Sequence, residues 1–236
     1  MWYCRVLLAL LAGLGPGSQP QPQVPVVAHV VWPAQLRMYY RDEQGRRFGS
    51  IGRLRAWLGQ HQQQLVFAMN GGMYAPGGAP QGLFIERGRL VTPLDTSRGT
   101  GNFYLPPNGV FYLTSGNQAK ICTTAQFATV ASPAWATQSG PLLLVGGTIN
   151  ARFTKGSRNV AVRNGVGILP GNRVVFAISR AKISFYNFTA YFKALGCQEA
   201  LYLDGYVSRL YLPQQGWQQT DGDFGVILGV SQPSRR

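Results

Sequence analysis

Asp204 is the residue of this chain best placed for acid–base chemistry. It lies in "ALYLDGYVSRLYLP" (residues 200–213), between apolar residues and a glycine, in a chain with only eight acidic residues. Partial burial among apolar residues raises the pKa of an aspartate by desolvation, unless a cation such as arginine offsets the effect. A carboxyl group tuned in this way can act as a general acid near neutral pH. The pattern fits equally well a structural aspartate whose oxygens accept hydrogen bonds from turn amides.

Four short segments place a hydrogen-bonding side chain beside a glycine next to an apolar strand. Glycine lets the backbone turn sharply or approach a ligand closely. Any single segment is more simply a tight turn, but four in one domain favour a shared site. The segments are "FAMNGGMY" (Asn70, Gly71, Gly72), "ATQSGPLLLV" (Gln138, Ser139, Gly140), "VAVRNGVGIL" (Arg163, Asn164) and "LYLDGYVS" (Asp204, Gly205).

Common cofactor and metal motifs are not matched. "GVGILPG" places its third glycine one residue too late for a dinucleotide fingerprint, and "NGGMYAPGG" lacks the lysine of a P-loop. The two histidines, His29 and His61, belong to no cluster with zinc spacing, and there is no GxSxG elbow. "DGDFG" (residues 221–225) reads as a solvated turn rather than a cation loop. We therefore expect neither a metal nor a cofactor.

The elements that must position these residues are short strands, tight turns and two main helices. "SIGRLRAWLGQHQQ" has apolar residues at helical spacing behind a potential cap at Ser50, and "FYNFTAYFKALG" is a second helix closed by Gly196. Hairpins are expected around Arg87–Gly88, around residues 115–117 and around residues 170–172. We predict the α+β class: a single domain over residues 26–236, with an extensive mixed or antiparallel sheet.

The N-terminus indicates export. Residues 1–18 have one positive charge, an apolar run and small residues, the layout of a signal peptide, although an uncleaved signal anchor is the competing reading. Residues 19–25 form a Pro/Gln-rich lead-in, and no other segment could span a membrane. We expect a secreted or periplasmic protein. Cys122 and Cys197 then remain, and they could pair in an oxidising compartment.

The positive charge of the chain points to an anionic partner without identifying it. Loss of Arg5 with the leader takes the formal net charge from +14 to +13. Arginine and lysine are scattered rather than interleaved with aromatic residues, so we do not expect a nucleic-acid partner.

These segments together resemble the phosphodiester glycosidase family. The resemblance runs from about residue 67 to 213, through "LVFAMNGGMYAPGGAPQGLFIERGRL", "GTGNFYLPPNGVFYL", "ATQSGPLLL", "VRNGVGIL" and "LGCQEALYLDGYVSRLYLP". It implies hydrolysis of the bond between the anomeric carbon of a sugar and a phosphodiester oxygen. Such a leaving group departs readily, so stabilisation of charge by arginine and backbone amides matters more than strong protonation.

The resemblance also implies roles for particular residues. Asp204 faces the anomeric carbon as acid/base or as stabiliser of positive charge, Arg163 clamps the phosphate, and the second carboxylate that glycosidases usually have is Glu86 or Asp95. A common site requires Asn70, Arg163 and Asp204 to lie together. The expected substrate-binding residues are Asn70, Gly71, Gly72, Gln138, Ser139, Gly140, Asn164, Gly205, Tyr206 and Ser208.

The chain departs from the family pattern directly after Asp204. Small residues are expected there, but Tyr206 and Arg209 occupy two of these positions while Ser208 keeps a hydroxyl. A tyrosine offers a stacking face for a sugar and an arginine offers a phosphate contact, so specificity is expected to lie here. The alternative to an enzyme is a binding protein: a non-catalytic envelope module that binds anionic glycans through the same pocket.

Overall fold

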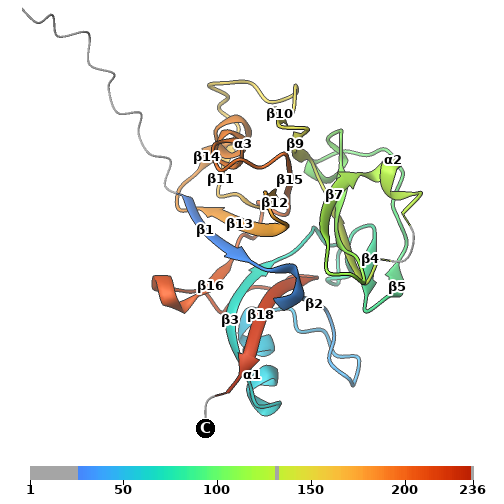
Figure 1. Cartoon of the computed structure of the whole chain (residues 1–236), viewed down its shortest axis with the longest axis vertical. Helices are drawn as coiled ribbons and strands as arrows, with labels where there is room; N and C mark the ends of the chain where they lie inside the picture. Colours follow the sequence, from blue (N-terminus) through green and yellow to red (C-terminus); the bar gives the residue numbers. More distant parts are fainter. Residues whose placement is uncertain (1–25, 131–132, 235–236) are drawn as a thin grey trace, which may run out of the picture.

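The computed structural model describes residues 26–130 and 133–234. The expected leader (residues 1–18) and lead-in (residues 19–25) lie outside the described residues. The described part has strands and helices in the α+β arrangement expected (Figure 1). No helix in this part is long and apolar enough to cross a membrane.

The strands form three main sheets rather than one extensive sheet, and every pairing is antiparallel. The six-stranded sheet has the order β1 (Val26–Val31), β13 (Arg173–Ser179), β12 (Asn164–Leu169), β15 (Glu199–Tyr202), β9 (Leu142–Val145), β10 (Thr148–Ile149). A five-stranded sheet has the order β17 (Trp217–Gln218), β16 (Leu210–Leu212), β3 (Gln63–Asn70), β18 (Ile227–Pro233), β2 (Leu36–Tyr39). The other has the order β5 (Arg89–Thr92), β4 (Phe84–Glu86), β8 (Trp135–Ser139), β6 (Gly109–Leu113), β7 (Ala119–Thr123). A small ladder pairs β11 (Val160–Ala161) with β14 (Ile183–Ser184).

The two main helices are α1 (Ile51–Gln60) and α3 (Phe185–Ala194), as predicted, and α2 (Thr124–Phe127) is one short turn. The Ser50 hydroxyl accepts a hydrogen bond from the Arg53 amide and so caps α1. Three 3-10 turns, η1 (Pro33–Gln35), η2 (Asn102–Tyr104) and η3 (Pro213–Gln215), complete the elements. The hairpins expected at Arg87–Gly88 and at residues 170–172 are present as β4–β5 and β12–β13.

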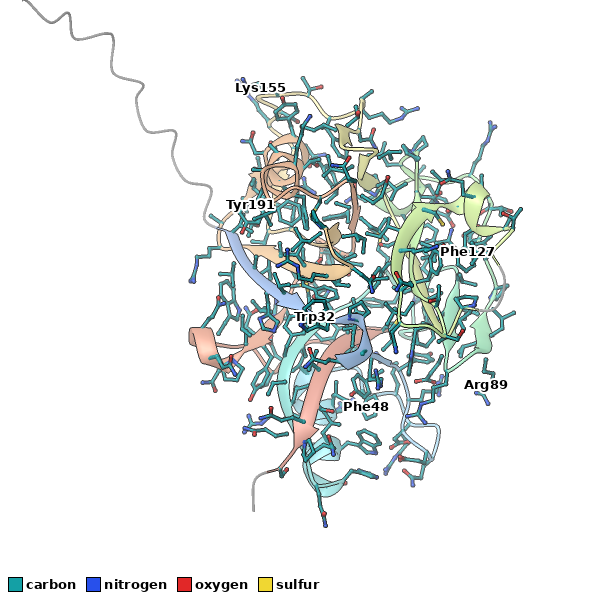
Figure 2. All side chains as sticks on the ribbon, in the orientation of Figure 1. Trp32, Phe48, Arg89, Phe127, Lys155 and Tyr191 are labelled. Atoms are coloured by element: carbon teal, nitrogen blue, oxygen red, sulfur yellow. The ribbon has the colours of Figure 1, made fainter. Side chains whose placement is uncertain are left out.

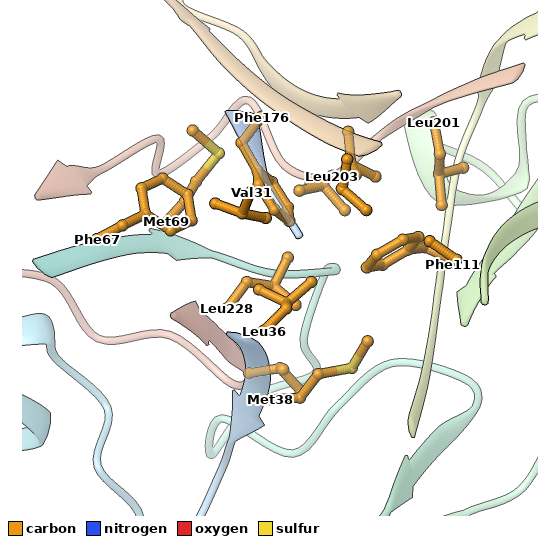
Figure 3. Packing of buried hydrophobic residues seen from close by; sticks show 14 of the residues in the cluster. Val31, Leu36, Met38, Phe67, Met69, Phe111, Phe176, Leu201, Leu203 and Leu228 are labelled. Carbon is orange, nitrogen blue, oxygen red and sulfur yellow. The ribbon is translucent and has the colours of Figure 1, made fainter. Parts of the chain in front are cut away.

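One apolar core is shared by all three sheets. Phe67 of β3, Phe111 of β6 and Phe176 of β13 come from different sheets and meet there (Figure 3). The outer faces are covered separately: α1 packs on the β3–β18 sheet and α3 packs on the six-stranded sheet (Figure 1). Because each sheet buries one face against the others, the strand ends that point into the shared region are fixed relative to one another.

The first two strands join different sheets. β1 pairs with β13, whereas β2 pairs with β18, and η1 turns the chain between them. The two strands therefore do not pair with each other, although they are adjacent in sequence.

Candidate functional site

Asp204 lies just beyond the end of β15, where the strand leaves the six-stranded sheet. The Asp204 amide donates to Asn164 Oδ1 at 2.8 Å, and the Leu203 amide donates to the Asn164 carbonyl at 3.2 Å. Asp204 is only 6% exposed. Its Oδ1 accepts a hydrogen bond from the Tyr206 amide at 2.8 Å, which closes a tight turn after the strand.

Asn70 and Asn164 join two sheets beside this carboxylate. Asn70 ends β3 and Asn164 begins β12, and Asn164 Nδ2 donates to Asn70 Oδ1 at 2.9 Å. The Arg209 amide donates to the same oxygen at 2.8 Å. These two donors fix the orientation of the Asn70 amide, because in the flipped orientation Nδ2 of Asn70 would face two other N–H donors.

The Nδ2 atom of Asn70 is the buried side-chain donor without a hydrogen-bond partner among the described residues. A buried polar group without a partner is uncommon and points to a ligand or water contact. Asn70 and Asp204 both hydrogen-bond to Asn164, so the unpaired donor belongs to the network that holds the carboxylate.

The third sheet reaches the same point through Ser139. Its hydroxyl, at the end of β8, donates to the Leu203 carbonyl at 2.7 Å, and the residue is fully buried. We call Asn70, Ser139, Asn164, Leu203 and Asp204 the three-sheet junction. All three sheets of the fold contribute to it.

The pKa of the Asp204 carboxyl is raised above its ordinary value. Burial is the largest cause, and the amides of Tyr206, Val207 and Gly205 oppose it by donating to the carboxylate. Asp204 therefore combines both features that the sequence suggested. The turn amides donate hydrogen bonds to its carboxylate, and desolvation still favours its protonated form.

Tyr74 lies near Asp204, and the sequence did not single it out. It is half-buried in the glycine-rich loop after β3, and its pKa is raised by burial and then by the negative charges of Asp204 and Asp223. Asp223, from the turn expected to be merely solvated, forms an ion pair with Arg47 at 2.7 Å. The only sequence signal for Tyr74 was its place in "NGGMYAPGG".

Arg163 is not placed as a phosphate clamp. Its side chain is 1% exposed, with Nε donating to the Ile183 carbonyl at 2.9 Å and Nη2 donating to the Asn159 carbonyl at 3.0 Å. The guanidinium stacks on Phe185, 3.5 Å from the ring centroid. Burial lowers the pKa of Arg163, and Tyr202 opposes this. Arg163 therefore lies close to the junction but acts as an anchor inside the fold.

Tyr202 connects Arg163 to the turn that carries Asp204. Arg163 Nη1 donates to the Tyr202 hydroxyl at 3.3 Å, and burial raises the pKa of Tyr202 to about 12. A Cβ atom at Gly205 would lie 1.6 Å from the same hydroxyl oxygen. Only glycine fits at position 205, because its backbone rests directly on this tyrosine.

Gln138 points away from the junction, although its neighbour Ser139 belongs to it. Its Oε1 accepts from the amides of Leu83 and Asp95 at 2.9 and 3.0 Å, and Nε2 donates to the Asp95 carbonyl at 2.7 Å. Successive residues of a strand face opposite sides, so the pair Gln138–Ser139 could not both reach one pocket. Gln138 is a structural residue rather than the expected substrate ligand.

The glycines expected to line an anionic pocket serve close packing instead. The Gly71 amide donates to the Val226 carbonyl at 2.8 Å and is not free for a ligand. A Cβ at Gly72 would lie 2.5 Å from the Gln138 carbonyl oxygen, and one at Gly140 would lie 2.5 Å from the Phe103 carbonyl oxygen.

The residues after Asp204 divide between surface and interior. Tyr206 is 96% exposed, whereas Ser208 is buried and its hydroxyl donates to the Asp204 carbonyl at 2.7 Å. Arg209 pairs with Asp221, with Nη2 2.8 Å from a carboxylate oxygen. The exposed ring of Tyr206 thus remains available as a sugar platform, while Arg209 is already engaged by a carboxylate.

Neither candidate for a second carboxylate contacts the junction. Glu86 pairs with Trp135 at the start of β8, the opposite end of that strand from Ser139. Asp95 accepts hydrogen bonds from the Ser97 and Tyr104 hydroxyls, and the Ser97 contact is the largest cause of its lowered pKa. Within the described ranges, no group of three or more His, Cys, Asp or Glu could hold a metal ion.

Known proteins share this sequence pattern and this fold. A family model described as phosphodiester glycosidase matches residues 63–225. The chain is 38% identical over 194 residues to the uncharacterized protein YigE of Escherichia coli K12, covering 81% of this chain and 76% of that protein.

Solved structures agree at the level of the fold. The catalytic domain of zebrafish N-acetylglucosamine-1-phosphodiester alpha-N-acetylglucosaminidase, auto-inhibited by its pro-peptide, superimposes with a TM-score of 0.60 at 12% identity, covering 90% of this chain and 85% of that one. A hypothetical protein from Synechocystis gives a TM-score of 0.52 at 14% identity, covering 87% of this chain and 59% of that one. From the family match and the YigE relative, this chain belongs to the phosphodiester glycosidase family.

Proposed function

We propose that this protein is a hydrolase that cleaves the sugar–phosphate bond of glycosyl phosphodiesters in envelope or extracellular glycans. The observation that carries the proposal is the three-sheet junction, where a buried carboxyl with a raised pKa lies in one network with the unpaired amide donor of Asn70. The family membership supplies the reaction class.

The proposed reaction adds water across the bond between the anomeric carbon and the phosphate oxygen. The hydroxyl of water goes to the carbon, its proton goes into solution or to the departing phosphate, and the products are a reducing sugar and a phosphomonoester. Asp204 serves as acid/base or stabilises the positive charge that develops at the anomeric carbon. Asn70 Nδ2 donates to a substrate oxygen, and the exposed ring of Tyr206 supports the sugar face.

Arg163 and Tyr202 act in this proposal as positioning residues. The guanidinium donates its hydrogen bonds to Ile183, Asn159 and Tyr202. It therefore holds the turn around Gly205 through Tyr202 instead of contacting phosphate. Charge on the departing phosphate is then stabilised by donors other than Arg163, with the basic character of the chain attracting the anionic substrate.

The test is turnover of a panel of sugar-1-phosphodiesters by the wild-type protein and by Asp204→Asn. We expect a loss of at least about 100-fold in turnover for the variant, the usual contribution of a general acid or base, with little change in substrate affinity. Glu199→Gln, which alters a half-buried carboxylate at the start of β15 and outside the junction, is the matched control and should retain activity. Failure of the wild type to release sugar from any member of the panel would overturn the hydrolase proposal.

A second candidate is a non-catalytic envelope module that binds anionic glycans. The observation that favours it is that neither Glu86 nor Asp95 joins Asp204, whereas glycosidases usually use two carboxylates. In that case wild type and Asp204→Asn would bind the same substrates with equal affinity, and neither would release sugar.

Export to the periplasm or the medium completes the proposal. It rests on the layout of residues 1–18. Fractionation of cells that express the full chain should recover a shorter protein outside the cytoplasm, and deletion of residues 2–18 should retain it inside. Full-length protein in the membrane fraction would instead indicate an uncleaved anchor.

A further inference from the structure

A groove of about 790 Å³ lies away from the three-sheet junction. Its walls are the edge strand β2, helix α1 and the β4–β5 hairpin, and no residue of the junction lines it (Figure 2, where Arg89 and Phe48 of its lining are labelled). Trp135, at the start of β8, belongs to the groove, whereas Ser139, four residues on, belongs to the junction. An extended strand spans about 13 Å over four residues, so the two regions are separate.

Four exposed arginines line this groove: Arg37, Arg41, Arg87 and Arg89. All eight acidic residues of the chain fall in the part that the structure describes, and none has a carboxylate oxygen within 4.0 Å of these guanidinium groups. Arg37 of β2 and Arg87 of the hairpin both oppose the rise that burial causes in the pKa of Tyr39. The two elements therefore direct positive charge toward the same hydroxyl.

Two of the three acidic residues in the groove are engaged by donors of the protein itself. Asp42 accepts from the amides of Gln44 and Arg46 and pairs with the Arg46 guanidinium at 2.7 Å. Glu43 accepts from Trp57 Nε1 at 3.0 Å. Glu86 is half-buried, and burial raises its pKa while the positive charges of Arg87 and Arg89 oppose that rise. Arg37 donates to the carbonyls of Ala34 and Leu36, and Arg41 donates to the Gly45 carbonyl and the Tyr40 hydroxyl, whereas the guanidinium groups of Arg87 and Arg89 donate to no other described residue. Arg87 and Arg89 therefore present the groove's free donors to solvent.

Aromatic rings lie between these charges. Trp57 and Trp135 are partly exposed and line the groove. Trp57 is held edge-to-face against Tyr39 and Phe48, with ring centroids 6.4 and 5.3 Å apart, and the tilted His61 ring lies 4.3 Å from it. A fixed indole face suits the apolar face of a sugar ring, and guanidinium groups suit phosphate oxygens, which they bind through paired N–H donors.

We propose that this groove binds a glycan chain that carries phosphate groups, at a site separate from the one that holds Asp204. Charge complementarity with the four arginines selects the phosphates, and Trp57 and Trp135 select sugar rings over other polyanions. The binding does not depend on hydrolysis at the junction.

The experiment measures binding of fluorescently labelled phosphorylated dextran to the chain that begins at residue 19, by anisotropy at fixed salt. The test variant is Arg87→Asn with Arg89→Ser, in which asparagine suits the left-handed turn at position 87 (φ 52°). The matched control is Arg152→Ser with Arg173→Ser, which removes the same charge from exposed positions outside the groove. We expect the test variant to bind about tenfold more weakly, and the control to change affinity by less than about twofold.

Several results would overturn the proposal. Equal losses in the test and control variants would show that net charge alone attracts the polymer. Equal affinity for neutral dextran of the same length would remove the role of phosphate, and equal affinity for an oligothymidylate of the same charge would indicate a nucleic-acid groove. Asp204→Asn should bind phosphorylated dextran as the wild type does, so this result is independent of whether the proposed hydrolysis occurs.

Discussion

Asp204 is buried in surroundings that favour its protonated form and yet supply donors to its ionised form. Desolvation raises its pKa, while the amides of Gly205, Tyr206 and Val207 limit the rise. A carboxyl group whose two states are brought closer in free energy exchanges protons more readily near neutral pH. This balance is set by a turn of four residues and by Asn164 beneath it.

The raised pKa predicts a pH dependence of stability. A carboxyl whose pKa is higher in the folded than in the unfolded state destabilises the fold increasingly as pH rises through the folded value. Asp204→Asn should therefore raise the Tm at pH 7, and the difference should shrink as the pH falls toward 4. Thermal unfolding of both proteins between pH 4 and 7 measures this.

Asp221→Asn is the control of opposite sign. Pairing with Arg209 lowers the pKa of Asp221, so its contribution to stability is present at neutral pH and is lost as the pH falls. This variant should lower the Tm at pH 7 and have little effect in acid. Identical pH profiles for the two variants would contradict the assigned environments.

Gly205 is predicted to tolerate no side chain while Tyr202 is present. Gly205→Ala places a Cβ on the Tyr202 hydroxyl, so we expect a loss of about 1–3 kcal/mol in stability and reduced turnover. Adding Tyr202→Phe removes the hydroxyl and should restore part of the stability. Gly116→Ala, where the nearest atom is 3.8 Å away, is the matched control. The absence of any rescue would show that the clash lies elsewhere.

At the scale of elements, the ends of strands from three sheets meet at the junction, and Ser139 is the contribution of β8. Ser139→Ala removes the hydrogen bond to the Leu203 carbonyl, which should cost about 1–2 kcal/mol and lower the Tm by roughly 2–8 °C. Because Leu203 precedes Asp204, we also expect turnover to fall. Ser115→Ala, in the exposed β6–β7 turn, should change stability by less than about 0.5 kcal/mol. Equal effects of the two substitutions, measured by thermal unfolding and turnover, would contradict the junction.

The elements that the sequence predicted are those specified by local chemistry. Ser50 caps α1, and the hairpin at Arg87–Gly88 follows from a turn in which both residues have positive φ. The distribution of strands over three sheets was not predictable from the sequence. β1 and β2 are adjacent in sequence, but β1 pairs with β13 and β2 pairs with β18, and both partners lie far along the chain.

The sequence predicted which residues lie together in the candidate site better than it predicted what each residue does there. Asn70, Asn164 and Asp204 do form one network, in accord with the four glycine-bearing segments. The side chains of Arg163 and Gln138 are hydrogen-bonded inside the fold to residues distant in sequence, Ile183 and Asn159 for Arg163 and Leu83 and Asp95 for Gln138, which no local pattern brings together. Burial of an arginine depends on the tertiary fold and leaves no signature in its neighbours.

At the scale of the whole molecule, the two cysteines of the described part are both free thiols. Burial raises the pKa of Cys122 and of Cys197 to about 11 each, so both are protonated at pH 8 and react slowly. We expect a chromogenic disulfide reagent to label the native chain starting at residue 19 only slowly at pH 8. In denaturant it should titrate two thiols, and a count of zero would show that Cys122 and Cys197 form a disulfide.

The position of β18 sets the time at which the molecule can acquire its site. The last strand of the chain lies between β2 and β3, so the sheet that supplies Asn70 is incomplete until residues 227–233 have been synthesised. Its pairings join residues far apart in sequence, and such folds form slowly. Until β18 has paired with β2 and β3, Asn70 has no fixed place beside Asn164 and the Asp204 turn, so the hydrogen-bond network of the junction is one of the last features of the fold to form.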